Sequence, residues 1–171
     1  MPLLQRLFRG KPDPREAMRP LWHRVVEVSR EPEWYANCGV ADTVAGRFDM
    51  IAAVLSLVLL RIEREPDCAP QSALLTELFV EDMDGQLREF GVGDVVVGKH
   101  IGKLMASLGG RLGAYRDALA KAEEAALKEA VRRNVTLVEG QEPQALAARL
   151  RAFANRLADM PVTEILAGNL S

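Results

Sequence analysis

The stretch MIAAVLSLVLL, residues 50–60, decides the fold class of this chain. It is apolar on nearly every face, yet a helix needs about 20 apolar residues to cross a bilayer. The stretch therefore predicts a buried helix and not a transmembrane one. Asp42 or Thr43 provides an N-cap ahead of it, and the helix is expected to run to about Glu65. A helix with so wide an apolar surface belongs at the centre of a bundle.

Amphipathic helices are predicted on both sides of this central helix. Apolar residues recur at helical spacing, and proline or glycine marks several of the ends. No strand pattern of convincing length and no internal repeat is present. The chain of 171 residues is 49% hydrophobic, which is enough for one core. We therefore predict an all-α, single-domain bundle of about six helices, with the other five over residues 14–29, 71–90, 97–119, 121–133 and 143–157.

The composition argues against several classes of function. A formal net charge of −2 and an aromatic content of 5% give little for nucleic acid to bind. Cys38 and Cys68 form no C-x-x-C pair and are expected to be reduced thiols. His23 and His100 stand alone, without the spacing of metal ligands. No nucleic acid, metal or cofactor is therefore expected to bind.

The stretch GVGDVVVGKH, residues 91–100, matches most of a phosphate-binding loop. Gly93, Gly98 and Lys99 have the right spacing, but His100 stands where a Ser or Thr would hold Mg²⁺. Such a loop follows a buried strand, whereas this stretch follows an amphipathic helical pattern. We interpret it as a turn between helices, in which Asp94 can cap the next helix. A nucleotide-dependent enzyme using Lys99 remains as an alternative.

Acidic and basic residues separate along the middle of the chain. Residues 62–90 contain eight acids and two arginines, a net charge of −6. Within them, Asp82 and Asp84 resemble the D-x-D-G loop of phosphoryl-transfer enzymes, but they lie in a helical period and indicate a solvated acidic helix face. Residues 98–121 contain five basic residues and one aspartate, a net charge of +4. The two segments can attract each other, or each can offer a patch to a partner.

Small residues recur every four positions along the helix predicted after His100. This stripe would let another helix approach closely, although an alanine-rich surface gives the same pattern. The residues are Gly102, Ala106, Gly110, Ala114 and Ala118.

The first twelve residues form a short basic amphipathic segment, and residues 13–171 form the helical domain. The segment lacks the features of a secretory signal. Its mixture of apolar and basic side chains is typical of an interfacial helix that touches anionic lipid, although so short a helix binds weakly and a frayed terminus is the alternative. The membrane-contact candidates are Leu3, Leu4, Arg6, Leu7, Phe8 and Arg9.

Several stretches, in this order, resemble the ubiquinol–cytochrome c chaperone family, the assembly factors of respiratory complex III. They are GVADTVAGRFDM (39–50), LLTELFVEDMDGQLREFGVGD (74–94), VGK (97–99) and GGRLGAY (109–115). The resemblance covers roughly residues 33–120. The chain departs from the family pattern at Ala41, where a proline is usual, and at Leu108 and Gly109, where an aromatic pair is frequent.

The resemblance implies a chaperone and not an enzyme. Members of the family guide newly made cytochrome b toward haem acquisition and complex assembly, in mitochondria together with a second assembly factor. Because the chain lacks a long targeting extension, we expect a bacterial cytoplasmic protein at the inner face of the membrane. A helical adaptor with a different client remains open.

The candidates for client binding are charged residues near helix ends and on the acidic helix. Such residues equally suit salt bridges inside a bundle, so a structural role stays open for each. They are Arg47, Asp49, Asp82, Asp84, Arg88, Glu89, Asp94 and Lys99.

Overall fold

A computed structural model describes residues 13–89 and 94–171, apart from the side chains of residues 87, 88 and 94–100. The described chain is helical, and its backbone pairing is limited to one isolated bridge. The 3-10 helices are η2 (Pro14–Met18) and η3 (Pro66–Cys68). The α-helices are α1 (Arg19–Ser29), α2 (Pro32–Ala36), α3 (Val44–Ile62), α4 (Ala69–Glu89), α5 (Asp94–Leu119), α6 (Glu124–Asn134), α7 (Gln144–Asp159) and α8 (Val162–Leu166).

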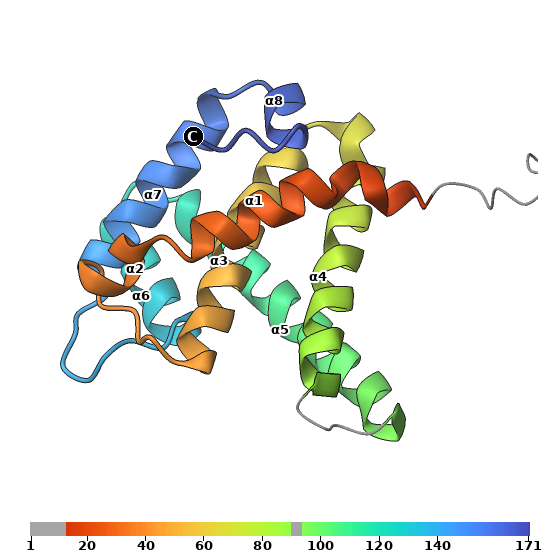
Figure 1. Ribbon diagram of the computed structural model, residues 1–171. Coiled ribbons are helices and arrows are strands. Elements are labelled where there is room, and N and C mark those ends of the chain that lie inside the picture. The colour runs from red at the N-terminus through yellow and green to blue at the C-terminus, as the bar shows by residue number, and fades with distance from the viewer. Residues whose placement is uncertain (1–12, 90–93) are drawn as a thin grey trace, which may run out of the picture.

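Helix α3 lies at the centre, as the apolar stretch predicts. Every residue from Met50 to Leu59 is buried. The helix contacts α1, α4, α5, α7 and α8, and Figure 1 shows α1 crossing it, with α4 on one side and α7 on the other. Burial on all sides explains why α3 has almost no polar face.

The first turn of α3 is fixed by a cap and by a close backbone approach. The Oγ1 atom of Thr43 accepts a hydrogen bond from the N–H of Gly46 at 3.1 Å, so Thr43 and not Asp42 is the N-cap. A Cβ atom added at Gly46 would lie 1.9 Å from the carbonyl oxygen of Ala41. Only glycine fits where the loop passes this close to the helix.

A short antiparallel bridge joins the loop before α3 to the loop after α6. Val40 pairs with Leu137. The N–H of Ala41 donates to the carbonyl of Thr136 at 3.0 Å, and that of Val138 donates to Gly39 at 2.9 Å. The bridge joins two segments that lie almost a hundred residues apart in the sequence, and it thereby fixes the position of the loop from which α3 starts.

The C-terminal helices complete the core. Helix α7 buries an apolar stripe made of Leu146, Ala147, Leu150, Phe153 and Leu157. Its Arg149 lies 4.5 Å from the ring centroid of Trp34 in α2 and pairs with Glu31 at 3.0 Å. The indole N–H of Trp34 donates to the carbonyl of Val28 at 2.6 Å. The last helices are therefore part of the same domain as the first.

The six longer helices match the six predicted ones, and the all-α fold is confirmed. The prediction missed α2 and α8, each of five residues, and the 3-10 helix η2 that opens the first predicted helix. The helix before Gly91 is confirmed, because α4 runs to Glu89. The predicted turn over residues 91–100 is wrong from Asp94 onward, because α5 already begins there, three residues before the predicted start at residue 97; Gly93 lies outside the described residues. A helix thus stands where a phosphate-binding loop needs a strand.

The predicted close packing along the small residues of α5 is wrong for the first half of the stripe. Gly102, Ala106 and Gly110 are exposed, and a Cβ atom at either glycine would meet nothing within 4 Å. Only the later part of the stripe reaches the core, where Ala118 is buried. In the described part of the chain, no helix covers the open stretch, since the far ends of α4 and α5 extend beyond the other helices (Figure 1).

Candidate functional site

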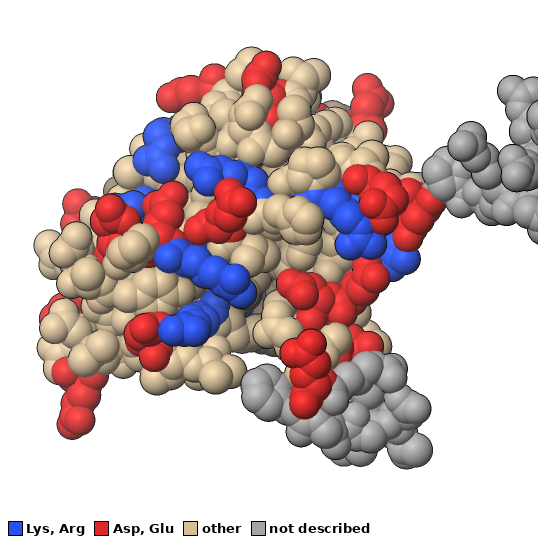
Figure 2. All heavy atoms as spheres, viewed as in Figure 1, with Lys and Arg blue, Asp and Glu red and all other residues tan. Residues whose placement is uncertain are grey.

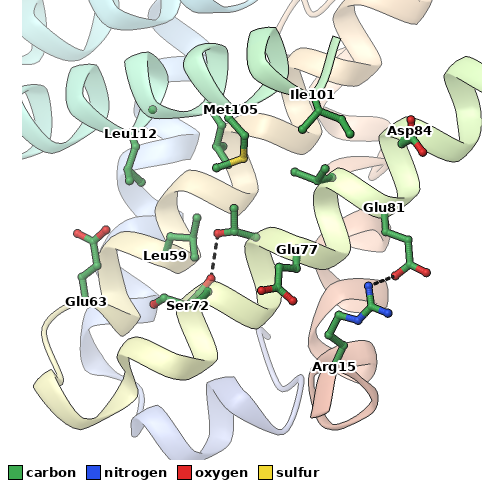
Figure 3. A pocket seen from close by; sticks show the side chains of 15 residues that line it. Arg15, Leu59, Glu63, Ser72, Glu77, Glu81, Asp84, Ile101, Met105 and Leu112 are labelled. Carbon is green, nitrogen blue, oxygen red and sulfur yellow. Dashed lines mark hydrogen bonds and ion pairs between the residues drawn. The ribbon is translucent and has the colours of Figure 1, made fainter. Parts of the chain in front are cut away.

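An open groove of about 800 Å³ lies between α4 and α5, above the end of α3. Apolar side chains from these three helices form its floor, and four carboxylates stand along its rim (Figure 3). We call it the acid-rimmed groove. Its floor includes Leu59, Val80, Ile101, Met105, Leu108 and Leu112, and its rim is formed by Glu63, Glu77, Glu81, Asp84 and Arg15.

Met105 is the most exposed large apolar side chain in this groove, with 43% of its surface accessible. In Figure 3 its side chain points from α5 into the space toward α4. Methionine is unbranched and polarisable, so it adapts to differently shaped apolar partners. Ile101 and Leu112 flank it at helical spacing and extend the apolar strip along α5.

Acidic side chains outnumber basic ones among the described lining residues of the groove, and arginines contact Glu81 and Glu63. Arg15 contacts Glu81 at 3.3 Å, and Arg116 contacts Glu63 at 2.7 Å. Glu77 makes no ion pair with another described residue. The described residues that line the groove therefore include four carboxylates and one guanidinium, that of Arg15. In Figure 2 acidic side chains gather over α4.

Arg15 is held at the rim by a second acid. Its guanidinium donates to both oxygens of Asp13, with the shortest distance 2.7 Å, and the backbone N–H of Arg15 donates to the same carboxylate at 2.9 Å. These hydrogen bonds lower the pKa of Asp13 to about 2. The pair fixes the beginning of η2 beside the groove.

The predicted acidic residues of α4 do not share one face. Asp84 lines the acid-rimmed groove, whereas Asp82 lines a separate hollow between α1 and α4. Two residues along a helix differ by about 200° in direction, which explains the separation. Glu89 is exposed at the last position of α4.

Asp49 is buried, with 7% of its surface accessible, and its hydrogen bonds stay inside the fold. It accepts from Arg111 at 2.5 Å, from the N–H of Thr136 at 2.9 Å and from the Thr136 hydroxyl at 2.7 Å. Arg111 also contacts Ser107 and lies 5.5 Å from the Phe48 ring centroid. Asp49 thus joins α3, α5 and the bridge, and it belongs to no exposed surface.

Arg47 lies outside the acid-rimmed groove. It is exposed and donates to Asp42 at 2.7 Å, which lowers the pKa of that carboxyl. It lines a further hollow, which the start of α3 forms with α4 and α5 and which is distinct from the hollow beside Asp82.

The remaining predicted residues cannot be placed at a site. The side chains of Arg88, Asp94 and Lys99 lie outside the described part. So do the membrane-contact candidates Leu3, Leu4, Arg6, Leu7, Phe8 and Arg9. Their roles stay predictions.

Sequence reasoning missed the apolar floor of the groove. Ile101, Met105 and Leu112 recur at helical spacing along α5, but periodicity identifies an apolar face without showing what covers it. The sequence signal that could have indicated the groove was a wide apolar stripe on α5, next along the chain to the strongly acidic α4.

Neither a membrane span nor a metal cluster is found in the described residues. No described helix has both the length and the hydropathy to cross a bilayer. No three described His, Cys, Asp or Glu side chains gather in a way that could hold a metal ion.

Comparison with known proteins identifies the family. A model of the ubiquinol–cytochrome c chaperone family matches residues 36–171. The fold is similar to the crystal structure of the Cbp3 homolog from Brucella abortus, with a TM-score of 0.80 and 31% sequence identity, over 99% of this chain and 96% of that one. No curated protein shows significant similarity. Because the family model spans most of the chain, this protein belongs to the ubiquinol–cytochrome c chaperone family.

Proposed function

We propose that the chain is an assembly chaperone that binds newly made cytochrome b and assists the biogenesis of ubiquinol–cytochrome c reductase. Family membership supports a chaperone with a client protein. The observation that carries the finer proposal is the acid-rimmed groove, whose floor is apolar and whose rim is negative.

The groove has the chemistry to bind a segment of a membrane protein. Transmembrane helices are apolar, and the cytoplasmic loops beside them are rich in Lys and Arg. Apolar side chains of such a segment would cover Met105 and its neighbours, and the basic flank would lie against Glu77 and Asp84. Binding of this kind needs no bond to be made or broken, so we propose that the protein acts without catalysis.

The proposed place of action is the cytoplasmic face of the membrane into which the client inserts. There the basic segment 1–12 would add weak contact with anionic lipid. A second assembly factor would complete the working complex. The place of action, the lipid contact and the second assembly factor extend the proposal, and client binding in the acid-rimmed groove does not depend on them.

Crosslinking from within the groove tests the proposal. Photoreactive p-benzoyl-phenylalanine replaces Met105 in the full chain, expressed in a respiring host, and crosslinked peptides are sequenced. The matched control carries the same group at Val138, which is 48% exposed and lines neither the acid-rimmed groove nor the hollow beside Arg47. We expect cytochrome b peptides from position 105 and none from 138. Reproducible crosslinks from 105 to another protein would overturn cytochrome b as the client and favour the adaptor.

Charge reversal provides an independent test. Glu77→Lys with Asp84→Lys should lower cytochrome b capture at least about tenfold, because both side chains line the groove. Asp82→Lys is the control on the same helix, since Asp82 lines a different hollow. Unchanged capture by a folded double variant would contradict the proposal.

A further inference from the structure

A second apolar groove, of about 610 Å³, lies on another face of the α4–α5 pair. Phe48, Ile51, Met83 and Leu104 form its floor. No described residue lines both this groove and the acid-rimmed groove. On α5, Leu104 lines this groove whereas Met105 lines the other, so the two open in different directions.

The rim of this second groove is basic. Arg30, at the end of α1, and Arg47, in α3, both line it, and none of the described residues that line it is acidic. Arg47 pairs only with the exposed Asp42 among the described residues, and Arg30 has no ion pair among them. The same two arginines also line an adjoining hollow beside Tyr35. We call this surface the arginine-rimmed groove.

Val44 stands at the mouth of the arginine-rimmed groove with 76% of its surface exposed. No other large apolar side chain in the described chain is as exposed. Behind it the floor is recessed, since Ile51 and Met83 are each only 5% exposed. A partner seated here would cover Val44 and reach past it to Phe48 and Leu104.

We propose that the arginine-rimmed groove docks an amphipathic helix of a partner protein, with acidic side chains beside its apolar stripe. Apolar residues spaced i and i+3 or i+4 on such a helix would fill the recessed floor. Its carboxylates would pair with Arg30 and Arg47, whose planar guanidinium groups suit bidentate contacts. A lipid surface is flat and would touch Val44 but leave the recessed floor uncovered. The charge at this rim is opposite to that of the proposed client groove, so it selects a different partner.

The proposal does not depend on which client occupies the acid-rimmed groove. Because no described residue lines both grooves, we expect a client and an acidic helix to bind at the same time. Failure at one groove leaves the other testable.

Photocrosslinking from Val44 is the first test. The full chain carries p-benzoyl-phenylalanine at position 44, or at the exposed Val138 as the control. We expect position 44, and not 138, to crosslink a peptide with a helical apolar period and neighbouring Asp or Glu residues. Crosslinks to lipid, to a second copy of this chain, or to a peptide without acids would overturn the proposal.

Charge exchange then separates docking from mere proximity. Arg30→Glu with Arg47→Glu should weaken the crosslink from position 44 at least about tenfold and leave the crosslink from Met105 unchanged. Replacing the acids of the captured helix by Lys should restore it. Arg24→Glu is the control, since Arg24 is another α1 arginine that lines neither groove. An undiminished crosslink in a double variant with an unchanged melting temperature would contradict the proposal.

Discussion

At the scale of single residues, the Asp49 carboxylate shows how this fold accommodates a buried charge. Desolvation of a carboxylate is costly, but one guanidinium and two donors of Thr136 satisfy its oxygens. These partners come from α5 and from the bridge segment after α6, so the Asp49 side chain connects three parts of the chain. Its value lies in fixing their arrangement.

Asp49→Ala should lower the free energy of unfolding by about 3–5 kcal/mol, because the guanidinium of Arg111, whose side chain is only 14% exposed, would lose its partner. Urea unfolding followed by circular dichroism measures the loss. Asp42→Ala serves as control, since its pair with Arg47 is exposed and should contribute little. Combining Asp49→Ala with Arg111→Met should recover part of the loss, and equal losses for both single carboxylate variants would contradict a structural role for Asp49.

Asp13 should titrate with a pKa of about 2 in the folded chain, below its ordinary value of 3.8. The cause is the hydrogen bonding to Arg15, so Arg15→Gln should raise the pKa toward the ordinary value. A lowered carboxyl pKa stabilises the folded state above about pH 4, and that contribution disappears as the pH falls toward 2. NMR titration of the Asp13 carboxyl in the unsubstituted chain and in Arg15→Gln measures the two pKa values. A midpoint near 4 in the unsubstituted chain would show that the pair does not form.

At the scale of elements, two helical glycines allow the effect of packing on stability to be distinguished from that of helix propensity. Gly46 is tightly packed, whereas Gly110 is surrounded by open space. Gly46→Ala should cost about 1–3 kcal/mol, because the new methyl group would collide with the carbonyl of Ala41. Gly110→Ala should instead stabilise α5 by about 0.5–1 kcal/mol, since open space surrounds it. Denaturant midpoints of the two variants decide this. A loss at Gly110 would mean that this face of α5 is covered in solution.

The positions of the long helices could be predicted from the sequence, since each buries an apolar stripe that repeats over several turns. Helices α2 and α8 could not be predicted, because five residues are too few to establish a period. The stripe of Gly102, Ala106 and Gly110 led to a wrong packing prediction for a different reason. Spacing defines a helix face, but only the tertiary arrangement determines whether another helix covers it.

At the scale of the whole molecule, the two grooves are formed by the way in which helices pack against one another. Sequence patterns describe single helices, so they could not predict the grooves. The acidic character of α4 was predictable from composition, and Asp84 does line a groove. Asp49 and Asp82, chosen by the same reasoning, lie in the core and in another hollow. Charge patterns alone do not distinguish a buried pair, a solvated face and a groove rim.

Removal of residues 144–171 should abolish cooperative unfolding, because α7 and α8 cover α3 and bury large apolar side chains. Loss of the sharp thermal transition and a red shift of tryptophan emission would report this, since Trp22 and Trp34 are both buried. A milder variant, Phe153→Ala, should cost about 3–5 kcal/mol. Asn155→Ala, at an exposed position of α7, is its control. A sharp transition in the truncated chain would contradict an integral role for α7.

The order of the helices along the chain has a consequence for synthesis on the ribosome. The apolar central helix α3 leaves the ribosome early, whereas residues 136–138 of the bridge and helix α7 follow more than seventy residues later. Until then α3 has only part of its cover, and nascent chains with uncovered apolar surface are prone to aggregate. Slowing translation between α3 and α7 should therefore lengthen the time during which the incomplete chain of this chaperone is open to aggregation and proteolysis.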